Sequence, residues 1–411
     1  MILRDPVHGD IEFTEAERRV MDTRQFQRLR GIRQTGTAYL VYPGCLHTRF
    51  EHSLGTSAMA RRIMGSLRRN GFSIDDHQEA AVSLAALVHD ISHLPFGHTF
   101  EDERKLFPRH DTADRLLYFL KSGEIAEAIE ASGVGEDVIG LLTDDAYPTP
   151  WMQQIISSTI DADLLDYLRR DAYFAGLRQD YDDRIFSTFV VEDQRLAVDT
   201  SKMSTRTEIL HLLRLRYFLT ERVYYHHAKV VSGAMIAKAV EIAVLRGMSE
   251  KDLYEFTDED LLRDLLLTGD EGISRLINNL NRRRLLKRGY TLTTAQVGRR
   301  GRDDLIVTYH RSIDARQEIE RQVADAVVLD PDQVILYCPD ISSIKEARVL
   351  VRTSEGLRRL NEPLDSPPFD VKAVEDQYER LWRLYVFAPE GYRDRVSAVC
   401  ERIFNQPSAT N

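Results

Sequence analysis

Residues 83–90 read SLAALVHD, an apolar run from Leu84 to Val88 that ends in the adjacent pair His89-Asp90. The run predicts a buried helix. A carboxylate at the end of such a helix is costly to bury without a partner, and a divalent cation is a partner that accepts nitrogen and oxygen ligands together. The alternative is that Asp90 caps a turn and His89 is a hydrogen-bonded core histidine, because an isolated His-Asp pair is common.

The histidines of the chain are concentrated around this pair. Of the twelve, seven lie between residues 47 and 110: His47, His52, His77, His89, His93, His98 and His110. His93 would lie on the same side as His89 if the helix continued, with Pro95 then ending it. A hydrophobic core does not need this concentration, so it favours a site that uses imidazole to bind a metal or move protons.

A second polar group lies in residues 161–171, which read DADLLDYLRRD. On a helix one face would carry polar side chains and another would carry leucines that pack on the core. The polar face is formed by Asp163, Asp166, Tyr167 and Arg170. The face is either solvated surface or one wall of the site. If it is a wall, Asp163 and its rival Asp161 are the candidates for a metal ligand, and Asp163 is the one that shares the polar face with Tyr167 and Arg170.

Composition indicates an ordinary globular protein. The 411 residues are 43% hydrophobic and 29% charged, and the net charge of −10 gives no global attraction for nucleic acid. The three cysteines (Cys45, Cys338 and Cys400) are too few and too far apart for a disulfide framework or a thiolate zinc site. No signal peptide and no apolar window of membrane-spanning length is recognisable, so we expect a cytoplasmic protein with no membrane partner.

The pattern changes near residue 280, which predicts a mainly α-helical body (residues 1–280, core about 45–180) and a smaller α+β C-terminal region (residues 281–411). In the body, residues 207–247 predict one long helix or two stacked ones, and residues 184–200 a small hairpin. In the C-terminal region we expect a helix at 371–382 and five strands, at residues 290–293, 304–309, 333–337, 347–351 and 383–387.

The order His52, His89-Asp90, Asp163 resembles the H…HD…D motif of the HD-domain phosphohydrolases. The similarity is greatest to their deoxynucleoside triphosphate triphosphohydrolase branch, here without a SAM domain. Flanking segments are similar too: DPVHG at residues 5–9, QFQRLR at 25–30 and YPG at 42–44, together with strands around Tyr337 and Tyr385. The resemblance therefore covers nearly the whole chain, and a four-part motif in a fixed order is far more specific than a dipeptide.

The resemblance implies one divalent metal held by His52, His89, Asp90 and Asp163. Two nitrogen and two oxygen ligands leave positions open for water and phosphate, which is typical of a catalytic site. They do not distinguish iron, manganese, cobalt, nickel, zinc and magnesium. A second Mg²⁺, bound through the phosphates, is also consistent with this chemistry.

The resemblance further implies roles for other residues. Arg49 would contact the α-phosphate, and His93, His98 and His110 would line the phosphate channel, where His98 or His110 would donate a proton or hold water. The substrate would also be bound by Gln34, Tyr167, Asp171, Arg216 and Tyr224. An activating guanine nucleotide would contact Asp22, Gln27 and Arg30 at a subunit contact of a dimer or tetramer. The tyrosines are otherwise core residues, and the activator positions otherwise an ordinary surface helix.

Two positions depart from the branch. Leu164 stands where a lysine for the phosphates is usual, which weakens the case for a triphosphate. Thr35 stands where a larger apolar residue usually presses on the sugar, so a ribose 2′-hydroxyl would be better tolerated. The sequence thus predicts hydrolysis of a deoxynucleoside triphosphate to deoxynucleoside and triphosphate as first choice.

Two other functions remain open at this point. One is a phosphodiesterase or nuclease acting on cyclic nucleotides, oligonucleotides or single strands, and the other is a nucleotide-sensing regulator. Basic clusters occur at residues 282–284, 287–288 and 299–302. Most such clusters are solvated surface, so nucleic acid is a less favoured partner than a nucleotide.

Overall fold

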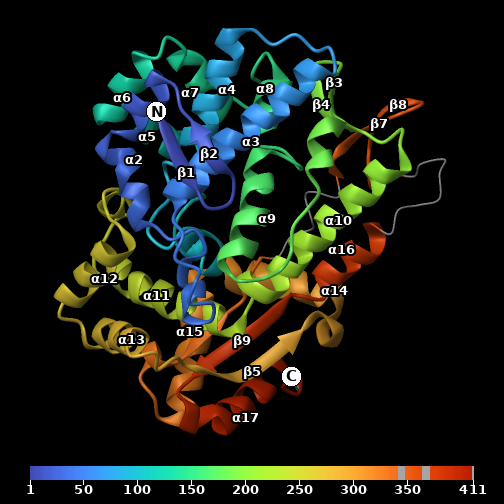
Figure 1. The fold of residues 1–411 in the computed structure, drawn as a ribbon. Coiled ribbons are helices and arrows are strands. Elements are labelled where there is room, and N and C mark those ends of the chain that lie inside the picture. The colour runs from blue at the N-terminus through green and yellow to red at the C-terminus, as the bar shows by residue number, and fades with distance from the viewer. Residues whose placement is uncertain (341–347, 363–370, 410–411) are drawn as a thin grey trace.

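The computed structural model describes residues 1–340, 348–362 and 371–409. The helical body is built from thirteen α-helices among these residues, coloured blue to yellow in Figure 1. They are α1 (Glu15–Met21), α2 (Arg24–Arg28), α3 (Arg49–Arg69), α4 (Asp76–Val88), α5 (Ala113–Leu120), α6 (Gly123–Glu130), α7 (Gly135–Thr143), α8 (Pro150–Ile156), α9 (Ala162–Phe174), α10 (Met203–Leu219), α11 (His227–Leu245), α12 (Asp258–Leu267) and α13 (Glu271–Asn281).

The C-terminal region contains the remaining described helices and most of the strands. The helices are α14 (Thr294–Leu305), α15 (Ile313–Val327), α16 (Val371–Glu379) and α17 (Arg393–Phe404). The strands of the chain are β1 (Ile2–Asp5), β2 (Gly9–Glu12), β3 (Phe189–Glu192), β4 (Arg195–Asp199), β5 (Lys287–Thr293), β6 (Ile335–Tyr337), β7 (Leu350–Thr353), β8 (Gly356–Arg359) and β9 (Arg383–Ala388). The fold is therefore mainly α with small sheets, as the sequence predicts.

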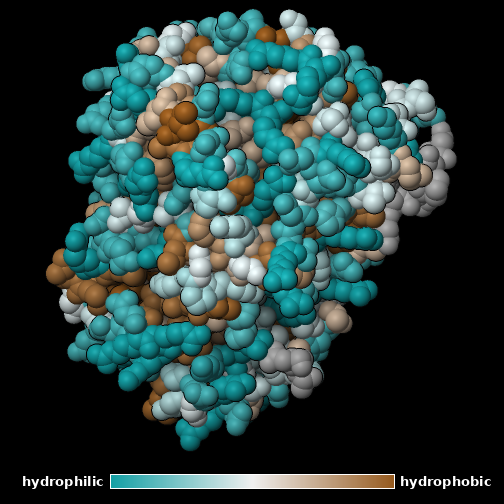
Figure 2. Space-filling view, in the orientation of Figure 1, coloured by the Kyte–Doolittle hydropathy of each residue, from teal (hydrophilic) through white to brown (hydrophobic). Residues whose placement is uncertain are grey.

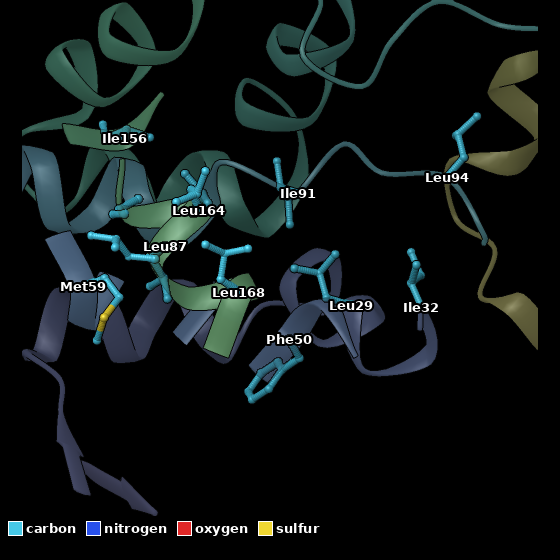
Figure 3. Close-up of a cluster of buried hydrophobic side chains, with 14 of the residues drawn as sticks. Leu29, Ile32, Phe50, Met59, Leu87, Ile91, Leu94, Ile156, Leu164 and Leu168 are labelled. Carbon is cyan, nitrogen blue, oxygen red and sulfur yellow. The ribbon is translucent and has the colours of Figure 1, made fainter. Parts of the chain in front are cut away.

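The centre of the body is formed by α3, which packs against both α4 and α9. Figure 3 shows the core between them, where Met59 of α3, Leu87 of α4 and Leu164 and Leu168 of α9 are labelled. All four side chains are buried. The leucine face of α9 thus packs on the core as expected, and its opposite face is directed toward the ends of α3 and α4.

The C-terminal sheet, in the order β5-β9-β6, has an apolar layer on each face. Along β9, Leu384 and Val386 belong to a small core shared with α15 and α17, whereas Tyr385 and Phe387 belong to the main core of the body. Successive side chains of a strand point to opposite faces, so this alternation places the sheet between the two cores. That arrangement explains why the sequence of the strand is apolar without interruption.

The sheet β3-β4-β7-β8 connects segments that are distant in the chain. The predicted hairpin is formed by β3 and β4, and its turn residues Asp193 and Gln194 both have positive φ, which matches the twist of a two-residue hairpin. β7 then pairs with β4 in parallel, so the C-terminal region returns to the body. The boundary near residue 280 stays a prediction.

The predicted strand at residues 304–309 is wrong. α14 continues through Leu305 into a π-helical turn at Ile306–His310. The run Ile306-Val307-Thr308 is rich in β-branched residues, which favoured a strand, but the buried residues are Arg302, Ile306 and His310, four apart. That spacing is helical, and packing of this face on the C-terminal core overrides the local preference.

The other expected elements are found with shifted ends. The long helical stretch is two helices, α10 and α11, separated by a π-helical turn at Thr220–Tyr224. The strand expected at residues 347–351 begins at Leu350, and Ala347 lies outside the described residues. The strands expected at 290–293, 333–337 and 383–387 correspond to β5, β6 and β9, and the helix at 371–382 to α16.

The surface in Figure 2 is mostly hydrophilic, with an apolar area at the left of the view, where α12 and α13 lie in Figure 1. Across residues 1–340, 348–362 and 371–409, none of the helices combines the length and the apolar character that a membrane span requires.

Candidate metal centre

His89 and Asp90 follow α4 directly, because the helix ends at Val88 and His89 is its C-cap. The helix does not continue to His93, so the expected helical alignment of His89 with His93 is wrong. A turn carries the chain instead, with the His93 amide donating to the Asp90 carbonyl. This turn still places the His93 Nε2 3.1 Å from the Asp90 Oδ1.

Four side chains from three helices or their ends converge beside this turn. The Nε2 of His52, on α3, lies 3.0 Å from the Asp163 Oδ1 and 3.5 Å from the Asp90 Oδ2. The Nε2 of His89 lies 3.4 Å from the Asp90 Oδ1 and 3.9 Å from the Asp163 Oδ1. Ligand atoms of His52, His89 and Asp163 all lie within 4.8 Å of one another. The structure therefore brings together all four sequence-predicted ligands.

The hydrogen bonds of the two imidazoles fit a cation at this point. The His89 Nδ1 lies 2.8 Å from the Ala86 carbonyl oxygen, which can only accept, so this nitrogen carries the proton. The His52 Nδ1 lies 2.7 Å from the Asp166 Oδ2 in the same way. Both Nε2 atoms then lie beside the carboxylates of Asp90 and Asp163, where a cation would take the place of a proton, and the buried His89 Nε2 has no hydrogen-bond partner. A donor set of neutral imidazoles and carboxylates suits a divalent metal.

The charges of the centre also favour a cation. Burial opposes protonation of His52, but hydrogen bonds to Asp163 and Asp166 and the charge of Asp90 outweigh it and raise its pKa to about 10. Burial acts against ionisation of Asp163 too, yet its hydrogen bonds with His52 and His89 hold its pKa below the usual range. The carboxylates therefore create a negative potential at the point where the ligand atoms converge.

Asp161, the rival ligand, is the N-cap of α9. Its Oδ1 accepts from the Leu164 amide and its Oδ2 from the Ser158 amide, at 2.8 and 2.6 Å. An aspartate that caps a helix in this way has both oxygens engaged. This favours Asp163, one turn into the helix, as the fourth ligand.

A second group of histidines lies on the other side of Asp90. The rings of His93 and His110 stack, with centroids 3.7 Å apart, and the His98 ring lies edge-on to both. Ligand atoms of these three histidines and of Glu101 lie within 4.8 Å of one another, close enough for a metal. Stacked rings direct their lone pairs nearly in parallel rather than to one point, however, so this geometry suits hydrogen bonding to phosphate better.

Glu101 was not singled out in the sequence. Its Oε2 lies 3.2 Å from the His98 Nδ1 and 3.0 Å from the His110 Nδ1, and its Oε1 accepts from Arg115 at 3.1 Å. The buried carboxylate thus holds two imidazoles through one oxygen. Glu101 lies inside the π-helical turn Thr99–Glu103, three residues after His98, and no local pattern in the sequence sets it apart.

Arg49 and His93 complete this part of the site. The Arg49 Nη1 donates to the Asp90 Oδ2 at 2.5 Å, so its guanidinium lies between the ligands and the histidine group. Burial lowers the pKa of His93 well below its usual value, and the charges of Arg49 and His110 lower it further. Gly97 has a φ of +59°, and a Cβ there would lie 2.7 Å from the Arg49 Nη2. Only glycine therefore allows the turn to pass this closely over Arg49.

A third group is centred on Asp171, two turns beyond Asp163 on α9. The Asp171 carboxylate accepts from the Tyr224 hydroxyl at 2.6 Å and is 2.8 Å from the His47 Nε2. Arg216 donates to the Tyr167 hydroxyl. The buried Gln34 Oε1 has no hydrogen-bond partner. The structure therefore links Asp171 with Tyr224 and Tyr167 with Arg216, and their roles toward a substrate stay predictions.

The residues expected to bind an activator are engaged in local contacts. Asp22 accepts from Arg18 at 2.6 Å. Gln27 accepts from the Arg30 Nε at 2.9 Å, and the Arg30 guanidinium lies over the Phe50 ring. These contacts neither require nor prevent a nucleotide, so the activator site stays a prediction.

Two protein-family models match this chain, one in its N-terminal half and one in its C-terminal half. Residues 49–171 match the model of the HD domain, and residues 180–411 match the model of the HD-associated region. The first match includes all four converging side chains, from His52 to Asp163, together with the histidine group and Asp171. The second match covers more than half of the chain.

Relatives of known sequence extend the comparison. The uncharacterized protein MJ1154 of Methanocaldococcus jannaschii is 29% identical over 399 residues, 95% of this chain and 79% of that protein. The uncharacterized protein YwfO of Bacillus subtilis is 32% identical over 59% of this chain and 55% of its own length. The human deoxynucleoside triphosphate triphosphohydrolase SAMHD1 is 28% identical over 58% of this chain, but the match spans only 44% of that protein.

Solved structures support the fold. A phosphohydrolase from Bacteroides thetaiotaomicron superposes with a TM-score of 0.73 at 23% sequence identity, covering 95% of this chain and all of that one. A hypothetical protein from Aquifex aeolicus superposes with a TM-score of 0.71, also at 23% identity, over 97% of this chain and 99% of its own. The arrangement of helices and small sheets is therefore shared by proteins of widely divergent sequence.

Proposed function

This chain belongs to the HD-domain phosphohydrolases, and on that premise we propose that it is a metal-dependent nucleotide phosphohydrolase that converts deoxynucleoside triphosphates into deoxynucleoside and triphosphate. One observation carries the proposal. The Nε2 atoms of His52 and His89 converge with the carboxylates of Asp90 and Asp163, next to an arginine and three histidines. Such a combination suits hydrolysis at phosphorus.

The metal would be held by His52, His89, Asp90 and Asp163. When bound, it would supply an activated water and polarise a phosphoryl oxygen. Its identity is left to experiment, because nitrogen and oxygen ligands of this kind accept iron, manganese, cobalt, nickel, zinc or magnesium. A second Mg²⁺ would reach the site with the phosphates of the substrate.

The protein's own groups have separate tasks in this proposal. Arg49 neutralises the phosphate next to the sugar, from its place beside Asp90. Glu101 accepts from the Nδ1 atoms of His98 and His110, which leaves their Nε2 atoms to hold water or to deliver a proton to the leaving oxygen. His93 stays neutral because its pKa is lowered, so it acts as a hydrogen-bonding group rather than a cation.

The sugar and base would lie along the C-terminal half of α9. In this proposal Asp171 and Gln34 bind the 3′-hydroxyl, Tyr167 and Tyr224 pack on the sugar or base, and Arg216 contacts a phosphate. The orphaned Gln34 Oε1 supports this assignment, because a buried acceptor without a partner is costly unless a ligand supplies one. The buried Thr35 hydroxyl supports tolerance of a 2′-hydroxyl, so ribonucleotides belong in the test.

The similarity to SAMHD1, which is named for its deoxynucleoside triphosphate triphosphohydrolase activity, supports the choice of substrate. By the same resemblance, Asp22, Gln27 and Arg30 would bind an activating guanine nucleotide at a contact between subunits of a dimer or tetramer. Equilibrium binding of GTP to the purified protein tests this part. A protein that neither binds GTP nor gains activity from it would contradict it.

Product analysis tests the reaction. The metal-loaded protein is incubated with the four deoxynucleoside triphosphates and the four ribonucleoside triphosphates, and the products are separated by chromatography. The proposal expects nucleoside and inorganic triphosphate in equal amounts, and no products with His89→Ala. Cleavage only of cyclic dinucleotides or single-stranded oligonucleotides would assign the protein to the phosphodiesterase and nuclease chemistry of the same fold.

A further inference from the structure

The Asp166 carboxylate lies behind the metal ligand His52 and is fully buried. Its Oδ2 lies 2.7 Å from the His52 Nδ1 and accepts from the Arg170 Nε at 2.8 Å. Its Oδ1 accepts from the Arg170 Nη2 at 2.9 Å and lies 2.6 Å from the His8 Nε2. One carboxylate therefore takes four hydrogen bonds from three side chains, and only one of these three belongs to the ligand set.

His8 reaches this carboxylate from the other end of the chain, 158 residues away. It lies in the turn between β1 and β2, which pair as a hairpin in register Asp5 to Gly9. The Asp5 Oδ1 accepts from the Val7 and His8 amides at 2.9 and 2.8 Å and so fixes the turn. The other oxygen of Asp5 accepts from the Arg170 Nη1 at 2.7 Å. Both ends of the turn are thus fastened to α9.

The packing of α3 leaves room for this network. Gly55, one turn beyond His52, faces α9, and a Cβ built on it would lie 1.8 Å from the Asp166 Oδ1 and 2.4 Å from the Arg170 Nη2. Its φ is not in the left-handed region, so the glycine is needed here for space and not for backbone conformation. The close approach buries the ion pair of Asp166 and Arg170 completely.

Resting on the metal centre of the proposed function, we infer that Asp5, His8, Asp166 and Arg170 form an outer shell of that centre, and that docking of the N-terminal hairpin and metal binding are coupled. Asp166 keeps the proton of His52 on Nδ1 and fixes the ring, so that the Nε2 lone pair faces the metal. Arg170 and His8 fix Asp166 in turn. A carboxylate behind a ligating histidine raises both its basicity and its affinity for metal.

The inference has a thermodynamic consequence for the hairpin. If His8 binds Asp166 more strongly when His52 is held by a metal, then the metal must stabilise the docked hairpin by the same free energy, because coupling between two sites is reciprocal. We therefore expect metal addition to slow amide hydrogen exchange in residues 2–12, which are far from the ligands in sequence.

Metal affinity of the full-length chain tests the inference without relying on activity. Apo protein is titrated with Mn²⁺ or Co²⁺ in competition with a chelating indicator, for the wild type, Asp166→Asn and His8→Gln. We expect both variants to bind about 10- to 100-fold more weakly. His77→Gln is the matched control, because His77 also pairs with an aspartate, Asp137 at 2.7 Å, but on the surface. Its affinity should equal that of the wild type.

The outcomes separate the inference from the proposal on which it rests. If the wild type binds no metal, both the proposed function and the outer shell are overturned. If the wild type binds metal and the folded His8→Gln and Asp166→Asn variants bind it equally well, only the outer shell is overturned. Should Asp166→Asn fail to fold, His8→Gln decides, since His8 lies in the turn of the N-terminal hairpin and not in the helical core. If the rates of amide hydrogen exchange in residues 2–12 are the same with and without metal, the coupling is also contradicted.

Discussion

Among the described residues, one buried network of charged side chains surrounds the metal ligands and another lies between the body and the C-terminal region. The second contains Arg104, Lys238, Glu241, Arg316 and Glu320, from the segment between His98 and His110 and from α11 and α15. All four of its carboxylate oxygens are hydrogen-bonded within the protein. The metal centre instead leaves the buried nitrogens of His93 and the Nε2 of His89 without hydrogen-bond partners.

The difference shows how a functional site can be told from a structural one. Buried charges in both places are paired, so burial and pairing do not discriminate. What discriminates is buried polar atoms that converge on a point and find no partner in the protein, because leaving them unbonded costs free energy that a ligand must restore. In the network around Arg104 the carboxylate oxygens are all hydrogen-bonded, and the one unpartnered buried atom among its described side chains is the Arg316 Nε, so no set of unpartnered atoms converges there.

Removal of one metal ligand should give the largest difference between the two networks. Asp163→Ala should abolish metal binding and lower kcat/KM by about 10³-fold or more, equivalent to about 4 kcal/mol of barrier. Metal content after gel filtration and the initial rate of product release measure the two effects. Asp161→Asn is the control, since asparagine caps a helix as well as aspartate does. Equal losses in both variants would show that the assignment of the fourth ligand is wrong.

Removing one charge from the network around Arg104 should lower the stability of the fold and leave metal binding unchanged. Glu241→Gln leaves Arg104 and Lys238 buried with too little negative charge, so we expect the free energy of unfolding to fall by about 3–5 kcal/mol. Chemical denaturation followed by circular dichroism measures it, and metal affinity measured in native buffer should be unchanged. A variant that keeps its stability but loses metal would reverse the roles given to the two networks.

The histidine group should give a smaller effect on catalysis alone. Glu101→Gln weakens the hold on His98 and His110, so we expect kcat to fall by about 10- to 100-fold with metal content unchanged. Asp76→Asn, an exposed carboxylate in the first turn of α4, serves as the control. The pH profile of kcat should change in Glu101→Gln but not in the control, and unchanged profiles in both would exclude a positioning role for Glu101.

The smallest expected effect is a pH dependence of stability. Burial opposes ionisation of Glu241, but the charges of Arg104, Lys238 and Arg316 lower its pKa to about 2, from 4.5. A lowered pKa means that the ionised group stabilises the fold above about pH 4.5 and that this contribution is lost as the pH falls toward 2. The difference in unfolding free energy between the wild type and Glu241→Gln should therefore shrink over that range. A constant difference would contradict the assignment.

Local patterns, together with the resemblance to the HD motif, were enough to predict which side chains converge but not what supports them. The apolar run before His89-Asp90 and the amphipathic pattern of α9 are local, so both helices and Asp163 could be expected from the sequence. Asp166 was expected on the polar face, yet its burial depends on Gly55 of α3 and on His8, whose contact spans 158 residues. Spacing along a helix predicts a face and does not reveal what covers it.

The failures have physical causes as well. The β-branched residues after Leu305 favoured a strand, but burial four residues apart keeps the segment helical. The helix before His89 ends earlier than Pro95 suggests, because a turn and not a helix brings His93 to Asp90. Glu101 carries no mark in the sequence that separates it from other acidic residues, since only the folded turn places His98 and His110 on the same oxygen.

Anomalous scattering from crystals of metal-supplemented protein, together with elemental analysis, tests the central claim most directly. The account predicts one strong anomalous peak within bonding distance of the His52 Nε2, the His89 Nε2 and the carboxylates of Asp90 and Asp163, and close to one metal ion per chain. A protein that carries no metal there after supplementation, or that binds it only at the group of His93, His98 and His110, would contradict the account.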